Sequence, residues 1–385
     1  MQIEQSTWTS AQGWTSASPR TLGAAAHLAL VFGAPALLRE PQTIQQIRQA
    51  YPQAHLLGCS TAGEICGTRV LDDSLVITAV HFEVTQLQGS SIRLREVQDS
   101  FHAGQKLALA LDHTGLVHVL VLADGTHING SELVRGLASQ LPPTVAITGG
   151  LAGDGARFEQ TLVCFNGLPE PEQVAILGFY GTGLNIGYGS VGGWDPFGPE
   201  RRITRSRGNV LFELDGDSAL ALYKTYLGPQ AAELPASGLL FPLSLRVNDG
   251  DLGVVRTILG ISEADQSITF AGDMPEGASV RLMKANFDRL IDGASRAAQA
   301  SSATIGAAAP ELAILISCVG RKLVLKQRIE EEVESVRDIF SEGTVLTGFY
   351  SYGEIAPFTR FGSCELHNQT MTITTFSERV ENGAG

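Results

Sequence analysis

Three short turns of similar sequence carry the residues best suited to chemistry. They are Leu57–Glu64 (LGCSTAGE), Thr148–Asp154 (TGGLAGD) and Thr347–Glu354 (TGFYSYGE), and each ends in glycine followed by a carboxylate. A carboxylate after a run of small residues has few neighbours of its own, so it can bind the amino or hydroxyl groups of a ligand. It can equally cap a helix or accept hydrogen bonds from backbone N–H groups in its own turn.

The first turn also offers a nucleophile. Cys59 lies beside Ser60 and Thr61 where a strand is expected to end, and a thiolate there would need a histidine as its base. The corresponding positions of the other two turns hold Gly150 and Phe349, so the cysteine is not a repeated feature. This comparison favours a buried small residue and shifts the prediction from catalysis to binding. The repeated glycines agree with binding, because they allow close backbone approach.

Two histidines stand in polar loops at strand ends. His127 (DGTHINGS) and His367 (CELHNQ) could each bind a ligand, ligate a haem iron or form a hydrogen-bonded turn. No spacing typical of a transition-metal site accompanies them. The nucleophile-elbow, phosphate-loop and dinucleotide-binding motifs are absent from the sequence, which argues against the common hydrolases and nucleotide-binding proteins.

The same order of expected elements surrounds each turn. An unbroken apolar strand comes first, then an amphipathic helix, a second strand that enters the turn, and a closing strand. The expected first strands are Leu28–Gly33, Val117–Gly125 and Leu312–Gly320, the helices 42–51, Ser131–Leu141 and Ile329–Phe340, and the closing strands Ser74–Phe82, Thr161–Phe165 and Gln369–Phe376. The recurrence predicts an internal triplication of β-α-turn-β modules in an α/β (α+β) fold, with mixed β-sheets flanked by helices. Strand order, and whether the turns share one pocket, do not follow from it.

The segment between the second and third modules changes character. Val174–Val191 is apolar and glycine-rich, which predicts a twisted pair of strands. Beyond it we expect a helix in Asn209–Gly228, a hairpin in Ile258–Val280, a helix at Asn286–Gln299 and a linker at Ser301–Ala309. Arginine, glycine and proline content places a domain boundary near residue 200. The predicted organisation is an irregular N-terminal arm at 1–24, a first domain at 25–200 and a second at 201–380.

Bulk composition narrows the classes of function. The chain has 385 residues, 44% of them hydrophobic and 17% charged, and a net charge of −13. This predicts a globular two-domain protein and argues against nonspecific binding to nucleic acid or to an anionic membrane. Arginines between Arg201 and Arg207 form a basic run that we expect in a solvated loop. Five cysteines without a CxxC pair, no signal peptide and no membrane-spanning run predict a reduced, cytoplasmic protein.

Longer segments resemble one known family. The GCSTAGE turn, LADG…NGSELVRGL, TGGLAGDG, AGDMPEG…VRLM and ISCVGR…TGFYSYGEIAP…LHNQTMTITTF are similar to FIST (F-box and intracellular signal transduction) domains. The similarity runs from about residue 25 to residue 376 and is most specific at the C-terminal end. The candidate ligand contacts in these segments are Cys59, Ser60, Thr61, Glu64, Asn129, Asp154, Arg321, Tyr350, Glu354 and Asn368.

The resemblance implies an intracellular signal-input protein with an N-terminal and a C-terminal FIST domain. Its ligands would be amino acids or similar metabolites. With no effector segment left over, we expect it to act on a separate signalling partner such as a histidine kinase, in bacterial two-component signalling, and a homodimer is compatible with this role. Some stand-alone members of the family bind haem and sense nitric oxide. A noncovalent haem b would make His127 and His367 the candidate axial ligands.

Two other classes of function stay open at this point. One is an enzyme that acts on a small metabolite through Cys59, with Glu64 or His367 as its partner. The other is a scaffold that needs no ligand.

Overall fold

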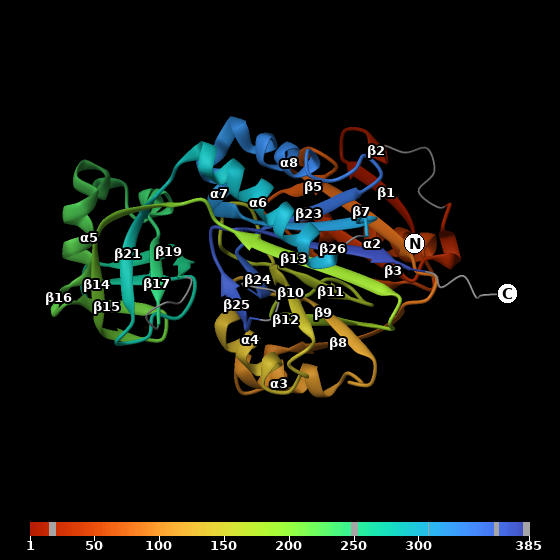
Figure 1. The fold of residues 1–385 in the computed structure, drawn as a ribbon, viewed down its shortest axis with the longest axis horizontal. Helices are drawn as coiled ribbons and strands as arrows, with labels where there is room; N and C mark the ends of the chain where they lie inside the picture. Colours follow the sequence, from red (N-terminus) through yellow and green to blue (C-terminus); the bar gives the residue numbers. More distant parts are fainter. Residues whose placement is uncertain (15–20, 248–252, 307, 358–361, 380–385) are drawn as a thin grey trace.

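The computed structural model describes residues 1–14, 21–247, 253–306, 308–357 and 362–379. Helices and mixed sheets form a large body and a smaller domain beside it (Figure 1). The predicted α/β class with two domains is confirmed. The N-terminus lies on the side of the large body that faces away from the smaller domain (Figure 1).

The large body consists of three modules with the same topology. In each module, the first strand pairs in parallel with the second strand and antiparallel with a return strand. The predicted triplication is therefore confirmed, with one correction. The strand predicted to close the second module, Thr161–Phe165, is not its return strand: Gln173–Tyr180 takes that place, and Val163–Phe165 pairs with the first module instead. The modules are β3 (Leu28–Gly33), α2 (Pro41–Ala50), β4 (His55–Ser60) and β7 (Ser74–His81); β9 (Leu116–Ala123), α4 (Gly130–Ala138), β10 (Ala146–Leu151) and β12 (Gln173–Tyr180); and β22 (Leu312–Cys318), α8 (Ile329–Arg337), β23 (Val345–Ser351) and β26 (Met371–Glu378).

Local sequence explains these elements. The first strands are buried along nearly their whole length, as expected for apolar strands covered on both faces. Pro41 occupies the first turn of α2, where its missing N–H leaves no hydrogen bond unmade. Ile44 and Ile47 of this helix are buried, as their spacing predicts. Asn129 caps α4, because its side chain accepts a hydrogen bond from the backbone N–H of Glu132.

The modules exchange short strands in a cycle. After its turn, each module sends one strand to the sheet of another module. Thus β5 (Glu64–Cys66) pairs with β23, β11 (Val163–Phe165) with β4, and β24 (Gly353–Pro357) with β10. Backbone hydrogen bonds also join every pair of turns, from Gly153 N to Ser60 O (2.9 Å), from Ala62 N to Tyr350 O (2.8 Å) and from Tyr352 N to Leu151 O (3.1 Å). The three turns therefore lie against one another at the centre of the large body.

Each turn contains a glycine that the sheet requires. Gly58, Gly149 and Gly348 lie opposite a residue of the first strand of their own module. A Cβ atom there would lie 2.3, 1.9 and 1.8 Å, respectively, from the carbonyl oxygen of that residue. Gly149 and Gly348 also have φ angles of +151° and +159°. The glycines recur because the neighbouring strand leaves no room for a side chain.

The N-terminus differs from the prediction of an irregular arm. Gln2–Thr9 forms β1, which pairs antiparallel with β7 along its whole length, and β2 (Gly13–Trp14) extends the sheet. Of the β1 residues only Ser6 is buried, so the strand has little of the apolar pattern that reveals a strand in a sequence. Residues 15–20 of the predicted arm lie outside the described residues.

Val174–Val191 also folds differently from the predicted strand pair. The segment forms β12 and β13 (Leu184–Val191), but β12 pairs with β9 and with β8 (Gln86–Arg93), whereas β13 pairs with β26 of another sheet. The glycines in β13 allow the backbone of α6 (Phe287–Ile305) to pack closely against this strand. A Cβ at Gly187 would lie 2.1 Å from the carbonyl oxygen of Ser301, so this strand admits the helix backbone at close range. This packing extends α6 into the segment predicted as a linker.

The remaining elements of the large body complete the three six-stranded sheets and cover them. Helix α3 packs on α4, and α6 packs on β13 and α8. These elements are β6 (Arg69–Leu71), β25 (Cys364–His367), α1 (Pro35–Leu38), α3 (Ser100–Leu109), α7 (Val319–Leu325), η1 (Gly23–Ala25), η2 (Leu94–Glu96) and η5 (Lys326–Arg328).

The smaller domain has one helix on an antiparallel sheet with its own core. The predicted hairpin is present as β19 and β20, and the predicted helix as α5. The arginine run is not a loop: it lies on the long strand β14, where Arg201 bonds to Asp215. The elements are β14 (Asp195–Arg207), β15 (Val210–Leu214), β16 (Asp217–Ser218), α5 (Ala219–Leu227), η3 (Gly228–Glu233), η4 (Ala236–Leu240), β17 (Leu243–Arg246), β18 (Val254–Arg256), β19 (Ile258–Ser262), β20 (Ser267–Phe270) and β21 (Ser279–Lys284).

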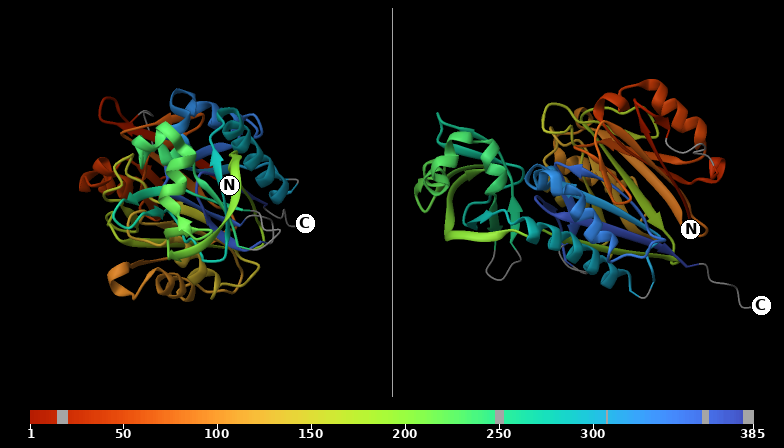
Figure 2. Two further views of the ribbon diagram at one scale, coloured as in Figure 1. Left: turned by 90° about the vertical axis from the view of Figure 1, so that its left-hand side faces the viewer. Right: turned by 90° about the horizontal axis from the view of Figure 1, so that it is seen from above.

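The chain crosses between the two bodies twice. It leaves the large body after β13, close to the predicted boundary, and returns from β21 into α6 (Figures 1 and 2). The part predicted as a second domain is therefore divided between the smaller domain and the third module. None of the helices in the described ranges is both long enough and apolar enough to cross a membrane.

Candidate functional site

A cavity of about 1560 Å³ lies between the large body and the smaller domain. That volume exceeds the usual range for metabolite sites. Its walls come from the β9–α4 loop, the turn before β11, the smaller domain and the end of α7. The lining residues are Gly125–Asn129, Leu151, Ala156–Phe158, Asn209, Glu233, Pro235–Ser237, Leu239, Leu240, Ile258, Leu259, Phe270–Gly272, Phe287, Leu323–Arg328 and Tyr352.

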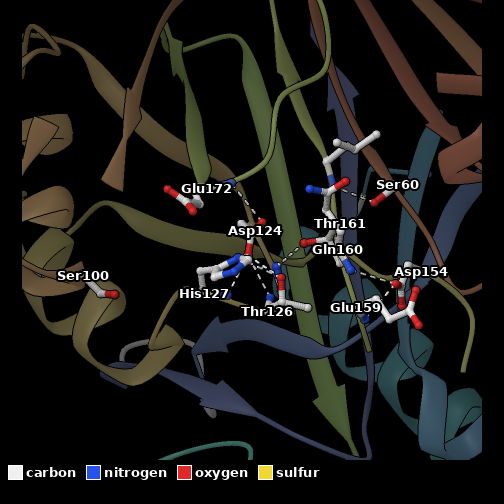
Figure 3. A network of polar contacts seen from close by, with 12 residues as sticks. Ser60, Ser100, Asp124, Thr126, His127, Asp154, Glu159, Gln160, Thr161 and Glu172 are labelled. Carbon is white, nitrogen blue, oxygen red and sulfur yellow. Dashed lines mark hydrogen bonds and ion pairs between the residues drawn. The ribbon is translucent and has the colours of Figure 1, made fainter. Parts of the chain in front are cut away.

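Asp124 fixes the first wall. Its buried carboxylate, directly after β9, accepts hydrogen bonds from the backbone N–H groups of Thr126 (2.8 Å), His127 (2.7 Å) and Glu172 (3.0 Å; Figure 3). The imidazole of His127 is 45% exposed and lines the cavity, with Nδ1 3.3 Å from Asp124 Oδ1. One ring nitrogen of this histidine therefore faces a carboxylate, which is the usual environment of a histidine that binds a metal through its other nitrogen.

Asp154 fixes the second wall in a similar way. The backbone N–H groups of Glu159 (3.0 Å) and Gln160 (3.0 Å) donate to its carboxylate (Figure 3). The backbone N–H of Phe158 (2.8 Å) and the hydroxyl of Tyr352 donate to it as well. Burial alone would raise the pKa of Asp154, but these hydrogen bonds hold the pKa below its usual value. The carboxylate is thus a fixed acceptor that shapes the loop from Phe158 to Gln160.

Phe158 is the most unusual residue of this wall. Its φ angle is +56°, a left-handed conformation that is rare for a bulky residue. Its ring stacks on Tyr352 with a centroid separation of 4.3 Å and an interplanar angle of 16°, yet Phe158 remains 42% exposed. The hydrogen bonds to Asp154 thus keep an aromatic face at the cavity in a backbone conformation that would otherwise be disfavoured.

Charged side chains at the cavity are mostly basic. Arg157, Lys326 and Arg328 line it, against the single acidic side chain of Glu233. Arg328 is paired with Glu331. The side-chain ammonium group of Lys326 has no hydrogen bond or ion pair to any other residue that the structure describes. The cavity therefore favours an anion, although the chain as a whole has a net charge of −13.

Two polar contacts join the bodies beside the cavity. The side-chain amide of Asn129 donates to Asp273 Oδ1 at 3.1 Å. The guanidinium of Arg256, on β18, donates to the carbonyl oxygen of Leu366 at 2.9 Å. Asn129 lines the cavity as well, so a ligand there would lie next to a contact between the two bodies.

The glutamates of the first and third turns do not line this cavity. Glu64 is buried and accepts hydrogen bonds from Thr61 and, at 2.6 Å, from Ser74. Glu354 is buried and accepts from Ser351 (2.5 Å) and from the N–H of Thr370 (3.1 Å). Burial raises the pKa of Glu64 to about 7 and that of Glu354 to about 8. Each joins its turn to the start of its module's return strand. Of the three repeated carboxylates, only Asp154 acts on the cavity wall, through Phe158.

Residues 59–61 lie in the interior too. Cys59 is fully buried among apolar side chains, and burial, with Glu64 and Cys164 nearby, raises the pKa of its thiol well above the usual value. A nucleophilic cysteine needs a thiolate and access for its substrate. The Ser60 hydroxyl accepts from Leu162 N at 2.8 Å, and Thr61 bonds to Glu64. The structure places all three residues away from the cavity.

The other predicted contacts divide between the interior and the cavity. Arg321 and Tyr350 are buried and both donate to Glu332, at 2.8 Å and 2.7 Å. Asn368 is buried, and neither polar atom of its amide has a hydrogen-bond partner among the described residues. Nε2 of His367 lies 2.9 Å from Ala356 O, and burial lowers the pKa of His367 to about 4. Only Asn129 and His127 of the predicted residues line the cavity.

Signals for the rest of the cavity lining are weak in the sequence. Tyr352 lies in the third repeated turn, but its neighbours there drew the prediction toward Tyr350 and Glu354. Phe158 and Lys326 have positive φ angles that no sequence pattern revealed. No group of three or more histidine, cysteine, aspartate or glutamate residues in the described chain could hold a metal ion.

The sequence of the chain matches two domains of one known protein family. The FIST N domain matches residues 27–217, and the FIST C domain matches residues 219–357. An uncharacterized protein of Methanocaldococcus jannaschii is 22% identical over 332 residues, which cover 78% of this chain and 61% of the relative. The chain thus spans about three-fifths of that relative's length.

Solved structures with some likeness include two enzymes. A chorismatase has a TM-score of 0.35 at 10% identity, with 97% of this chain and 98% of the other covered. A cyanuric acid hydrolase from A. caulinodans has a TM-score of 0.36 at 8% identity, with 98% and 99% covered. At these TM-scores, neither likeness bears on the function of this chain.

Proposed function

The chain belongs to the FIST family of sensory domains, and we propose that it senses a small molecule bound, without turnover, in the cavity between its two bodies. The observation that carries this proposal is the origin of the cavity walls. Residues of the three-module body and of the smaller domain line the same cavity. A ligand that contacts both bodies changes the free energy of their relative placement, which is what a signal-input protein requires.

The proposal includes a separate signalling partner, such as a histidine kinase. The smaller domain is joined to the large body by two crossings and by the contacts of Asn129 and Arg256. Its position is therefore the feature that a bound ligand would change first. A cytoplasmic location and action on the partner through this domain are parts of the same proposal.

The test combines a thermal-shift screen with a variant that fills the cavity. Ala236 is exposed and lines the cavity, so Ala236→Trp should occupy the ligand volume without disturbing the core. Ala110, directly after α3, is exposed and does not line the cavity, which makes Ala110→Trp the matched control. A ligand at 100 times its dissociation constant should stabilise the wild type by about 2.7 kcal/mol. If Ala236→Trp responds to that ligand as the wild type does, the proposed site is wrong.

Haem is a second candidate ligand, and His127 supports it. Its Nδ1 faces the buried carboxylate of Asp124, it lines the cavity, and apolar side chains such as Leu240 and Phe270 lie on the other walls. Haem iron bound to one histidine would supply a coordination position for nitric oxide. His367 is buried next to Ala356 O and does not line the cavity, so His127 is the better candidate for the axial ligand.

An absorption spectrum of protein expressed with a haem supply tests this candidate. A Soret band that shifts with nitric oxide and is lost in His127→Ala, but kept in His367→Ala, would support it. A colourless protein that still responds to metabolites would leave the sensor proposal standing without haem. Turnover of a metabolite that disappears in Cys59→Ser would instead contradict sensing without catalysis.

A further inference from the structure

We infer that the cavity takes a ligand with a planar aromatic ring and a carboxylate, with the ring on Phe158 and the negative charge among Arg157 and Lys326. This inference rests on the proposed function and adds the chemical class of the ligand. Three features of the described residues carry it. They are the aromatic pair, the balance of charge and the way in which the loop holds Phe158.

The aromatic pair offers one open face. Phe158 stacks on Tyr352 at 4.3 Å with nearly parallel rings, and 42% of Phe158 remains exposed at the cavity. The Tyr352 hydroxyl is engaged by Asp154, which holds this ring in place from behind. A fixed ring with an exposed face is a stacking surface for a flat ligand, because aromatic rings prefer offset-stacked neighbours.

Hydrogen bonds of the loop hold the Phe158 ring at the cavity. Phe158 has a φ angle of +56°, where glycine would be favoured on backbone grounds alone. The structure instead keeps phenylalanine there, with its N–H on Asp154 at 2.8 Å and on the Tyr352 hydroxyl at 3.2 Å. A bulky apolar residue that is both exposed and held in a disfavoured conformation points to a function for its ring.

The charges indicate the second part of the ligand. The Arg157 guanidinium lies 4.0 Å from the Asp154 carboxylate. Because that carboxylate already accepts hydrogen bonds from three backbone N–H groups and a hydroxyl, much of the positive charge of Arg157 remains available to a ligand. Lys326 lines the same cavity, and its ammonium group has no partner in the described part of the chain. Two cations at a mostly apolar cavity fit a compact anion on an apolar ligand, and a carboxylate is the simplest such group.

The test uses four small probes that separate ring from charge. 2-Naphthoate has both features, cyclohexanecarboxylate only the carboxylate, 2-naphthamide only the ring, and phenylalanine adds an ammonium group. Isothermal titration of the full chain should show binding of 2-naphthoate, with cyclohexanecarboxylate and 2-naphthamide each weaker by about tenfold or more. Phenylalanine as the tighter aromatic ligand would extend the inference to amino acids, with Glu233 as the contact for the ammonium group.

Two variants assign the contacts. Phe158→Leu keeps an apolar side chain but removes the ring, and should weaken 2-naphthoate about tenfold while cyclohexanecarboxylate changes little. Lys326→Gln should weaken both carboxylates by about tenfold and leave 2-naphthamide unchanged. Phe212→Leu and Lys284→Gln are matched controls, because neither residue lines the cavity. Circular dichroism would confirm that each variant is folded.

The outcomes also separate this inference from the proposed function. Equal binding of cyclohexanecarboxylate and 2-naphthoate, unchanged in Phe158→Leu, would overturn the aromatic ligand class. If that binding were still lost in Ala236→Trp, the cavity would remain the sensory site. If none of the four probes bound, but another metabolite bound to the wild type and not to Ala236→Trp, the ligand class alone would likewise be overturned. Binding that is the same in Ala236→Trp as in the wild type would overturn both the ligand class and the proposed site.

Discussion

Replacement of Glu354 by glutamine tests whether the repeated carboxylates stabilise the fold in their protonated form. Oε1 of Glu354 accepts from the Ser351 hydroxyl at 2.5 Å, and Oε2 accepts from Thr370 N at 3.1 Å and Thr370 Oγ1 at 2.9 Å. The Ser351 hydroxyl can donate instead to Ser317 O, 3.2 Å away. A glutamine amide can then donate to Ser351 Oγ, so the variant mimics the protonated acid without leaving a buried group unpaired.

The sign of the effect follows from the raised pKa. Burial raises the pKa of Glu354 from 4.5 to about 8, so the folded chain binds this proton more tightly than the unfolded chain. The free energy of unfolding therefore falls as the pH rises from the unfolded pKa to the folded pKa, and is flat above it. At about 1.4 kcal/mol per pKa unit, the wild type should lose about 3 kcal/mol through this group between about pH 5.5 and about pH 9.

Urea unfolding, followed by tryptophan fluorescence at the two pH values, measures this loss. Other titrating groups, such as the buried His118 and His367, contribute equally to wild type and variant, so the difference between the two proteins isolates Glu354. Between about pH 5.5 and about pH 9, we expect the free energy of unfolding of Glu354→Gln to rise by about 3 kcal/mol relative to that of the wild type. Glu64→Gln should gain about 2 kcal/mol, because burial raises its pKa only to about 7.

The exposed Glu342 provides the matched control, since Glu342→Gln should show no such gain. A Glu354→Gln difference that is the same at both pH values would refute the reasoning, because it would mean that the carboxyl titrates alike in the folded and unfolded chain. Greater stability of the wild type at high pH would refute it as well, since that result requires a stabilised carboxylate.

Three further predictions test the parts of the molecule that hold the cavity. Gly149→Ala should lower the free energy of unfolding by about 3 kcal/mol or more in urea unfolding, because its Cβ would lie 1.9 Å from Val121 O at a φ of +151°. Asp154→Ala should weaken any cavity ligand about tenfold in titration calorimetry, because Phe158 loses the carboxylate that holds its N–H; unchanged affinity would contradict this role. Arg321→Met should destabilise by about 3–5 kcal/mol because it leaves the buried carboxylate of Glu332 without its positively charged partner. Stability should partly return in the double variant Arg321→Met, Glu332→Gln.

The three-module body was predictable because its signals are local and repeated. Leu28–Gly33 and Leu312–Gly320 are apolar runs typical of a strand buried on both faces, and β3 and β22 form there. The exchange of β5, β11 and β24 was not predictable, since strands of three to five residues leave no periodicity of their own. The same holds for β1, whose pairing with β7 depends on a partner more than sixty residues away in the sequence.

The site was harder to predict because its parts belong together only in three dimensions. The repeated turns drew attention to Glu64, Asp154 and Glu354 as one pocket. The turns do meet, but the glutamates accept hydrogen bonds from their own modules, and only Asp154 reaches the cavity wall. Phe158 and Lys326 stand in stretches without a motif. Both residues have a positive φ angle, and both line a cavity whose other walls come from the smaller domain, and neither feature can be read from the sequence.

Under the proposed function, Arg321 is placed to connect the cavity with the smaller domain. Its guanidinium donates to Gly192 O and to Leu290 O, both at 2.6 Å. Gly192 lies on the first crossing, between β13 and β14, and Leu290 lies in the first turn of α6, just after the second crossing. The same residue belongs to α7, whose last turn and following residues, Leu323–Arg328, line the cavity. Under the proposed function, a ligand that shifted the end of α7 would therefore act on a buried residue that contacts the chain beside both crossings. Because the three-module body is tied together by exchanged strands, the movement that results should appear in the smaller domain.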